Sequence, residues 1–155
     1  MKHQSSYLKL VVYLSLFMFL QALLLPDLLA AQSVDCQYDP AKPSIDNARK
    51  NFKITNYVCA EKELKDLLAQ ESLSIEDKAD AHVLLASVYY AMLRNDKNKK
   101  TKVTEQFVEA FKAYSAWRGD LDIRSPEFLA MMDEAKELVA KQDSAKAAAA
   151  AEVPE

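Results

Sequence analysis

The residues of this chain with the clearest chemistry of their own are its two cysteines, Cys36 and Cys59. A redox or catalytic thiol usually needs a C-x-x-C partner or a base that generates the thiolate. The chain has no C-x-x-C motif, and His82 is the one histidine outside the N-terminal segment. Two cysteines exposed to an oxidising compartment tend to pair. The sequence therefore predicts a structural Cys36–Cys59 disulfide, with a reactive thiol as the alternative.

Other kinds of reactive site find little support. With Gly119 as its single glycine, the chain cannot form the glycine-rich loops that cradle phosphates. Acidic residues gather at one expected turn, at Glu71, Glu76, Asp77 and Asp80. They lack the dense alternation of oxygen ligands that calcium requires, and His82 alone cannot form a metal site or a catalytic relay. We therefore expect no enzyme, no cofactor and no metal, although dispersed carboxylates leave a hydrolase open.

The first part of the chain has the form of an export signal. Basic residues precede an apolar run over residues 10–25, Pro26 ends the run, and small residues follow. This pattern predicts a signal peptide over residues 1–31, cleaved after Ala31, and a periplasmic or secreted protein. The alternative is an uncleaved anchor, although the run is shorter than the roughly 20 apolar residues that a spanning helix needs. Membrane contact is expected through this segment alone.

The elements that position the remaining residues are expected to be helices. Apolar side chains recur at helical spacing, and no stretch of the exported part alternates as a half-buried strand does. The predicted fold class is all-α, with about five antiparallel helices in one domain over residues 44–141. Residues 32–43 form an N-terminal arm. The alanine-rich tail, residues 142–155, lacks large apolar side chains and is expected to be a fraying extension or a disordered end.

Polar residues mark the expected helix boundaries. Ser44 is predicted to cap the first helix, and Ser74 with Asp77 resembles a capping box at the third. Ser125 before Pro126 indicates the start of the fifth helix. Thr55 and Asn56 offer a turn before the second, and the fourth is expected over residues 102–118, with Gly119 as its C-cap.

Basic residues concentrate between the third and fourth helices, at Arg94, Lys97, Lys99, Lys100 and Lys102. The formal net charge of the chain is −3, and no aromatic residue alternates with these cations. Both facts argue against a nucleic-acid partner. The patch is predicted either to contact an anionic partner in the envelope or to be a solvated turn.

A second candidate surface consists of large side chains on the helical stripes, at Tyr89, Tyr90, Tyr114, Trp117, Met131 and Met132. Amphipathic aromatic residues often anchor peptide ligands in grooves between helices, and methionine adapts to varied partners. We consider these six residues a candidate partner-binding surface. Packing in the core is the alternative, since all of them continue stripes that must be buried.

The third and fourth helices resemble a tetratricopeptide repeat, a hairpin of two helices with characteristic residues. Leu85, Ala86 and Tyr89 have the spacing of the family's leucine, small and aromatic positions, and Phe107 and Ala110 match its later aromatic and small positions. The whole run is similar to the short tetratricopeptide-like domains of bacterial envelope proteins. This resemblance implies stacked helical hairpins and protein–protein interaction rather than catalysis.

Two functional hypotheses follow. The first is an exported, non-enzymatic tetratricopeptide-like module that binds an envelope protein or peptide, as an accessory or assembly factor of an envelope complex. The second is a small secreted helical carrier that encloses an apolar ligand between its helices. The sequence indicates no oligomeric state.

Overall fold

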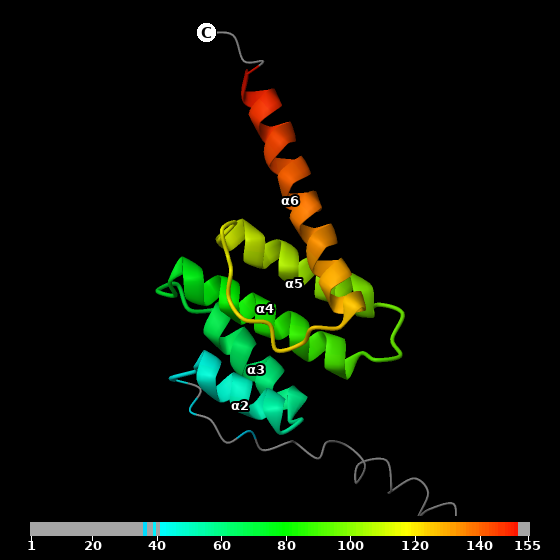
Figure 1. Cartoon of the computed structure of the whole chain (residues 1–155). Coiled ribbons are helices and arrows are strands. Elements are labelled where there is room, and N and C mark those ends of the chain that lie inside the picture. The colour runs from blue at the N-terminus through cyan, green and yellow to red at the C-terminus, as the bar shows by residue number, and fades with distance from the viewer. Residues whose placement is uncertain (1–35, 37–38, 40, 152–155) are drawn as a thin grey trace, which may run out of the picture. The chain divides into compact units, whose positions relative to one another are not determined.

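The computed structural model describes Cys36, Asp39 and residues 41–151 of the chain. The predicted signal peptide, most of the arm and residues 152–155 lie outside the described residues. Within the described part the secondary structure is five helices and no strand, which confirms the all-α class (Figure 1). The helices are α2 (Ile45–Lys53), α3 (Tyr57–Leu68), α4 (Ile75–Met92), α5 (Lys99–Ala113) and α6 (Pro126–Ala151).

Serine side chains cap three of these helices, as predicted. The Oγ atoms of Ser44, Ser74 and Ser125 accept hydrogen bonds from the backbone N–H three residues further on, at 3.2, 3.1 and 3.2 Å. Each bond satisfies an N–H that has no partner within its own helix. The Asp77 carboxylate accepts from the Ser74 hydroxyl at 2.8 Å, so this pair departs from a capping box, in which the carboxylate reaches the backbone.

The second helix starts differently from the other predicted starts. Asn56 is its N-cap residue but makes no side-chain capping bond. The tight turn before it is formed by Thr55, which has a φ of 62° and is the single non-glycine residue with positive φ among the described residues. The sequence predicts a turn at this place, and the chain forms it through the Thr55 backbone, without a side-chain cap at Asn56.

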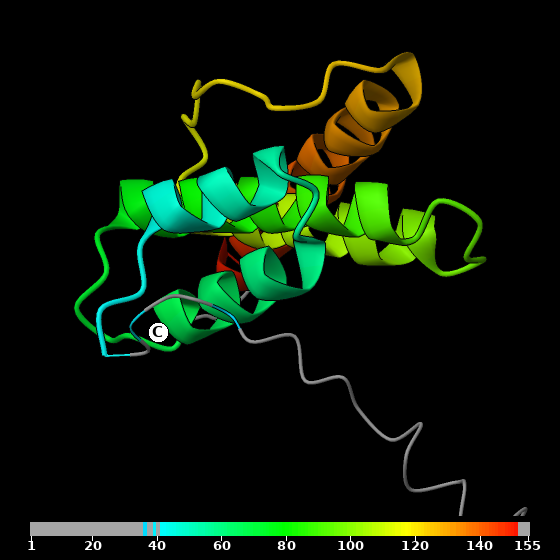
Figure 2. The same cartoon turned by 90° about the horizontal axis from the view of Figure 1, so that it is seen from below.

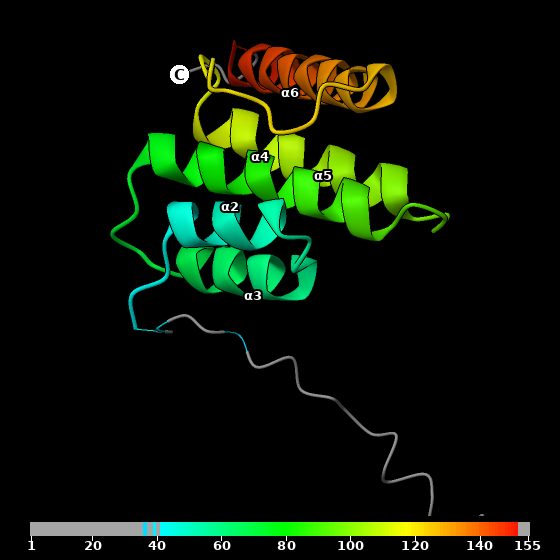
Figure 3. The ribbon, with the colours of Figure 1, turned by 60° about the horizontal axis from the view of Figure 1, so that its bottom comes forward.

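Helix α4 is the centre of the fold. It packs against α3 on one side and α5 on the other, and the α2–α3 pair and α6 lie on opposite sides of the α4–α5 pair (Figure 3). Ala86 of α4 and Ala110 of α5 are fully buried, and these small residues let the two helices approach closely. The buried rings of Phe107 and Phe128, with centroids 5.0 Å apart, join α5 to α6. One apolar core therefore runs through all five helices.

The antiparallel order predicted for the helices holds for the hairpins α2–α3 and α4–α5. Helix α6 departs from it. Glu127 at the start of α6 pairs with Lys99 at the start of α5, and Lys136 lies over Phe111 near the end of α5. The connection over residues 114–125 returns along the helices before α6 begins (Figures 1 and 2). As a result, α6 crosses α5 in the same general direction.

The predicted end of the fourth helix is wrong. Helix α5 spans Lys99–Ala113, not residues 102–118, and its C-cap residue is Tyr114 rather than Gly119. The apolar spacing misleads here because Trp117, beyond the helix, is buried by folding back. Gly119 is needed for space instead: a Cβ atom at this position would lie 2.7 Å from the Trp117 ring.

The boundary predicted at residue 141 is also not the end of the last helix. Helix α6 continues through Ala151, and the fraying or disorder expected of the tail stays a prediction. Residues 141–150 are exposed, and alanine's high intrinsic helix propensity accounts for a helix without packing partners. None of the helices in the described part, α6 included, has the apolar length that crossing a membrane requires.

Candidate functional site

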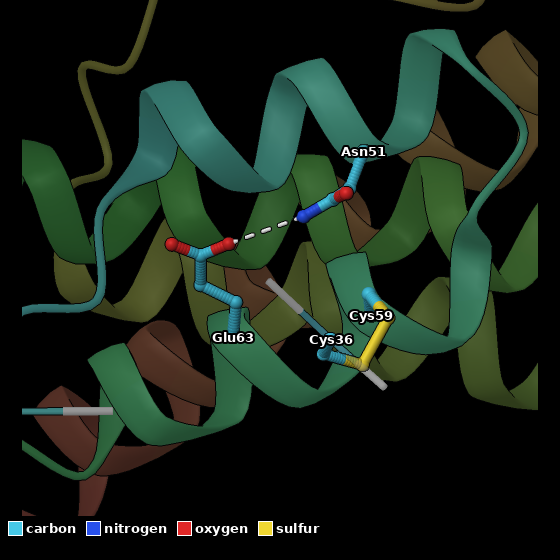
Figure 4. Close-up of a disulfide and its surroundings, with 4 residues drawn as sticks. All are labelled: Cys36, Asn51, Cys59 and Glu63. Carbon is cyan, nitrogen blue, oxygen red and sulfur yellow. Dashed lines mark hydrogen bonds between the residues drawn. A yellow bond between two sulfur atoms is a disulfide. The ribbon is translucent and has the colours of Figure 1, made fainter. Parts of the chain in front are cut away.

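The disulfide is present as predicted, between Cys36 in the arm and Cys59 in α3 (Figure 4). Their Cα atoms are 5.2 Å apart, and Cys59 is fully buried. Both cysteines of the chain are in this bond, so the alternative of a reactive free thiol is wrong. The bond ties the arm to α3 and has a structural role.

A buried carboxylate beside the disulfide was not predicted. Glu63 of α3 is fully buried, and one of its oxygens accepts from the Ser44 backbone N–H at 3.1 Å. The other oxygen accepts from Asn51 Nδ2 at 3.4 Å (Figure 4). In a capping box the glutamate belongs to the capped helix. Here α3 supplies the carboxylate to the start of α2. The position of Glu63 between Ala60 and Leu67, on the apolar stripe of α3, was the available signal.

One cavity of about 690 Å³ gathers several of the predicted site residues, and we call it the Tyr90 pocket. It is lined by Phe52, Tyr57, Tyr90, Ala91, Arg94, Lys99, Ile123 and Glu127, which come from all five helices and two connections. Its volume lies within the roughly 300–1,000 Å³ typical of ligand pockets. Phe52 and Tyr57, whose ring centroids are 5.5 Å apart, were not predicted because their part in the pocket depends on how α2 packs against α4.

A hydrogen-bond network fixes one wall of the Tyr90 pocket. The Tyr90 hydroxyl donates to Glu127 Oε2 at 2.8 Å and accepts from the Ser125 hydroxyl at 2.9 Å. Lys99 Nζ lies 2.7 Å from Glu127 Oε1 and 4.6 Å from the centroid of the Tyr90 ring. The hydrogen bonds from Lys99 and Tyr90 hold the pKa of Glu127 below its usual range. Charge on this wall is therefore already balanced within the protein.

Arg94, which also lines the Tyr90 pocket, carries a charge that no other described side chain balances. Its side chain is exposed and makes no hydrogen bond or ion pair with any other described residue. A guanidinium group offers donors in a fork that matches a carboxylate. The pocket thus combines aromatic rings with one uncompensated cation.

The predicted basic patch is divided by these contacts. Lys99 and Lys100 form ion pairs with Glu127 and Glu134 of α6, at 2.7 and 2.8 Å. Lys102 Nζ lies 5.5 Å from the centroid of the Tyr89 ring. Arg94 and Lys97 are exposed, and their side chains have no partner among the described residues.

The six predicted partner-binding side chains do not share one groove. Tyr90 belongs to the Tyr90 pocket, whereas Tyr89 and Met131 are buried in the core. The Tyr89 hydroxyl donates to Glu61 at 3.1 Å, and burial raises its pKa. Tyr114 is half-buried in the connection after α5.

The remaining two, Trp117 and Met132, line a second cavity of about 540 Å³ between the end of α5, the following connection and α6. We call it the Trp117 pocket. Its other lining residues are Phe111, Ser115, Arg118, Gly119, Leu121, Lys136, Val139, Ala140 and Asp143. The indole Nε1 donates to Asp80 of α4 at 2.5 Å, which fixes the ring in place.

Three of the polar residues weighed for metal or acid–base chemistry, Asp77, Asp80 and His82, have hydrogen-bond partners within the fold. The Asp77 carboxylate accepts from the Ser74 hydroxyl, and the Asp80 carboxylate accepts from the Trp117 indole. No group of three or more His, Cys, Asp or Glu side chains with the arrangement of a metal site occurs among the residues that the structure describes. His82 Nδ1 lies 2.9 Å from Gln106 Oε1, and burial lowers the pKa of this imidazole.

Comparison of the chain with protein-family models, with curated proteins and with solved structures finds no match. The tetratricopeptide resemblance therefore stays a prediction. The residues on which it rests, among them Ala86, Phe107 and Ala110, are buried between packed helices. Any close helical hairpin would bury them, so function has to be argued from the two pockets.

Proposed function

We propose that this chain is an exported, non-enzymatic protein-interaction module built of tetratricopeptide-like hairpins, and that it serves an envelope complex as an accessory or assembly factor. The observation that carries this proposal is the Tyr90 pocket, where the unpaired Arg94 borders three aromatic side chains. The partner surface is this pocket.

The chemistry of the pocket favours a peptide segment with a carboxylate next to an apolar side chain. Tyrosine and arginine are enriched in protein interfaces and dominate their binding energy. The rings of Phe52, Tyr57 and Tyr90 bury an apolar group, while Arg94 pairs with the carboxylate. The Tyr90–Glu127–Lys99 network holds its wall before the partner arrives, which lowers the entropic cost of binding.

Export is part of the proposal and rests on two features. The N-terminal segment has the pattern of a signal peptide. The Cys36–Cys59 disulfide is compatible with an oxidising compartment, in which such bonds form and persist. N-terminal sequencing of the protein from its envelope distinguishes cleavage after Ala31 from an uncleaved anchor.

The experiment is capture from envelope extract after mild crosslinking, comparing wild type with Arg94→Glu and with Lys97→Glu. Both positions are exposed, neither side chain has a partner among the described residues, and both substitutions change charge equally. Lys97 does not line the pocket. We expect wild type and Lys97→Glu to recover the same partner and Arg94→Glu to lose it. Recovery of no partner by wild type, or equal recovery by both variants, contradicts the proposal.

A further inference from the structure

The Trp117 pocket differs in chemistry from the Tyr90 pocket. Its floor is apolar, formed by Phe111, Trp117, Met132 and Val139, and three of these four side chains are buried. Figure 1 shows the second half of α6 continuing beyond the end of α5. The pocket is lined by residues from the end of α5, the following connection and α6. The apolar side chains of these three segments thus surround a cavity.

Charge at the rim of the Trp117 pocket is positive on balance. Arg118 and Lys136 line it, together with the single acid Asp143. Arg118 uses one nitrogen to donate to the Trp117 carbonyl at 2.8 Å, which leaves its other donors for a ligand. Lys136 Nζ lies 3.5 Å from Asp133, a long contact between exposed groups that contributes little. Two cations above an apolar floor are complementary to an amphiphile with one negative charge.

We propose that the Trp117 pocket binds a single-chain amphiphilic carboxylate, a fatty acid, with its chain against Phe111, Trp117 and Met132 and its head group between Arg118 and Lys136. The cavity of about 540 Å³ has the size of a small-molecule pocket. This site does not rest on the peptide-binding function, since none of its lining residues is shared with the Tyr90 pocket.

The test uses the full exported chain and three probes: decanoate, dodecanoate and the uncharged dodecanol, each below the concentration at which it aggregates. Isothermal titration calorimetry measures affinity, and Trp117, the single tryptophan of the chain, reports occupancy by fluorescence. Each methylene that becomes buried strengthens binding about fourfold, so dodecanoate should bind roughly fifteenfold more tightly than decanoate. Dodecanol should bind more weakly than dodecanoate.

Two sets of variants assign the binding to this pocket. Ala140→Phe projects a ring into the pocket from an exposed position on α6, and Ala145→Phe places the same ring at an exposed position on the opposite face of α6. If the ring of Ala140→Phe displaces two methylenes of the ligand, dodecanoate binding weakens about fifteenfold. The control variant should bind dodecanoate as wild type does. Replacing Arg118 and Lys136 with glutamine weakens dodecanoate binding by up to about fivefold each and leaves dodecanol binding unchanged.

Several results would overturn the proposal. Absence of saturable dodecanoate binding rules the site out. Equal affinity for dodecanol and dodecanoate would show that the two cations do not bind the head group. Equal dodecanoate binding by Ala140→Phe and Ala145→Phe would show that the ligand binds elsewhere. A dimer in analytical ultracentrifugation that Ala140→Phe alone dissociates shows that a second copy occupies the pocket instead. Arg94→Glu should bind dodecanoate as wild type does, so failure of this site is distinguishable from failure of the peptide-binding function.

Discussion

Replacing Glu63 with glutamine removes one of the two acceptor oxygens that hold α2 against α3. The carboxylate receives two donors, the Ser44 backbone N–H at 3.1 Å and Asn51 Nδ2 at 3.4 Å, one on each oxygen. Glutamine has nearly the same shape but a single oxygen. Its NH₂ group must therefore face one of these donors, at a position that is fully buried.

The expected loss of stability follows from these contacts. A buried donor left without an acceptor costs about 1–3 kcal/mol. A negative charge near the N-terminus of a helix contributes about 0.3–1 kcal/mol, and glutamine removes it from the start of α2. The sum is about 1–4 kcal/mol, a large share of the roughly 5–15 kcal/mol by which domains are usually stable. Removing the Asn51 donor should relieve part of this cost, because the remaining amide oxygen then serves Ser44 alone.

Urea unfolding followed by circular dichroism measures these changes in Glu63→Gln, Asn51→Ala and the double variant. We expect Asn51→Ala to cost at least about 1 kcal/mol less in the Glu63→Gln background than in wild type. The control is Glu137→Gln on α6, an exposed residue 3.8 Å from Lys141, where a change below about 0.5 kcal/mol is expected. A Glu63→Gln protein within 0.5 kcal/mol of wild type, or strictly additive effects with Asn51→Ala, would refute the reasoning.

Three further predictions concern single features of the fold. Replacing Cys36 and Cys59 with alanine should lower the free energy of unfolding by about 3 kcal/mol, because the disulfide joins residues 23 positions apart in the chain. Equal urea midpoints for the variant and the oxidised wild type would contradict this. Gly119→Ala should lower the free energy of unfolding by about 1–3 kcal/mol and shift the tryptophan emission, because the new Cβ would lie 2.7 Å from the Trp117 ring. An unchanged emission and melting temperature would show that the ring moves aside without cost. Burial lowers the pKa of His82 from its ordinary 6.5, so the unfolded chain binds the proton more readily and stability falls as pH drops below about 6.5. His82→Gln should flatten that dependence in melting curves between pH 8 and pH 5, and an identical slope would exclude His82 as its source.

The features that the sequence predicts correctly are set by interactions between residues close together in the chain. The serine caps at Ser44, Ser74 and Ser125 need a donor three residues away, and the all-α class follows from apolar spacing within each helix. The role of Glu63 was missed because its partner Ser44 lies 19 positions earlier and on another helix. An acid on an apolar stripe signals a buried partner, but the spacing cannot say which one.

Over residues 114–118 the helix predicted from apolar spacing is absent, and the connection found over residues 114–125 lines part of both pockets. Helical spacing continues through Trp117, yet the chain leaves the helix at Ala113, because burying the indole against Asp80 and over Gly119 competes with one more helical turn. The same segment contributes Leu121 to the Trp117 pocket and Ile123 to the Tyr90 pocket. Sites often lie where local rules and the fold disagree. In this chain a packed tryptophan ends a helix early, and the irregular backbone that results supplies one wall of each cavity.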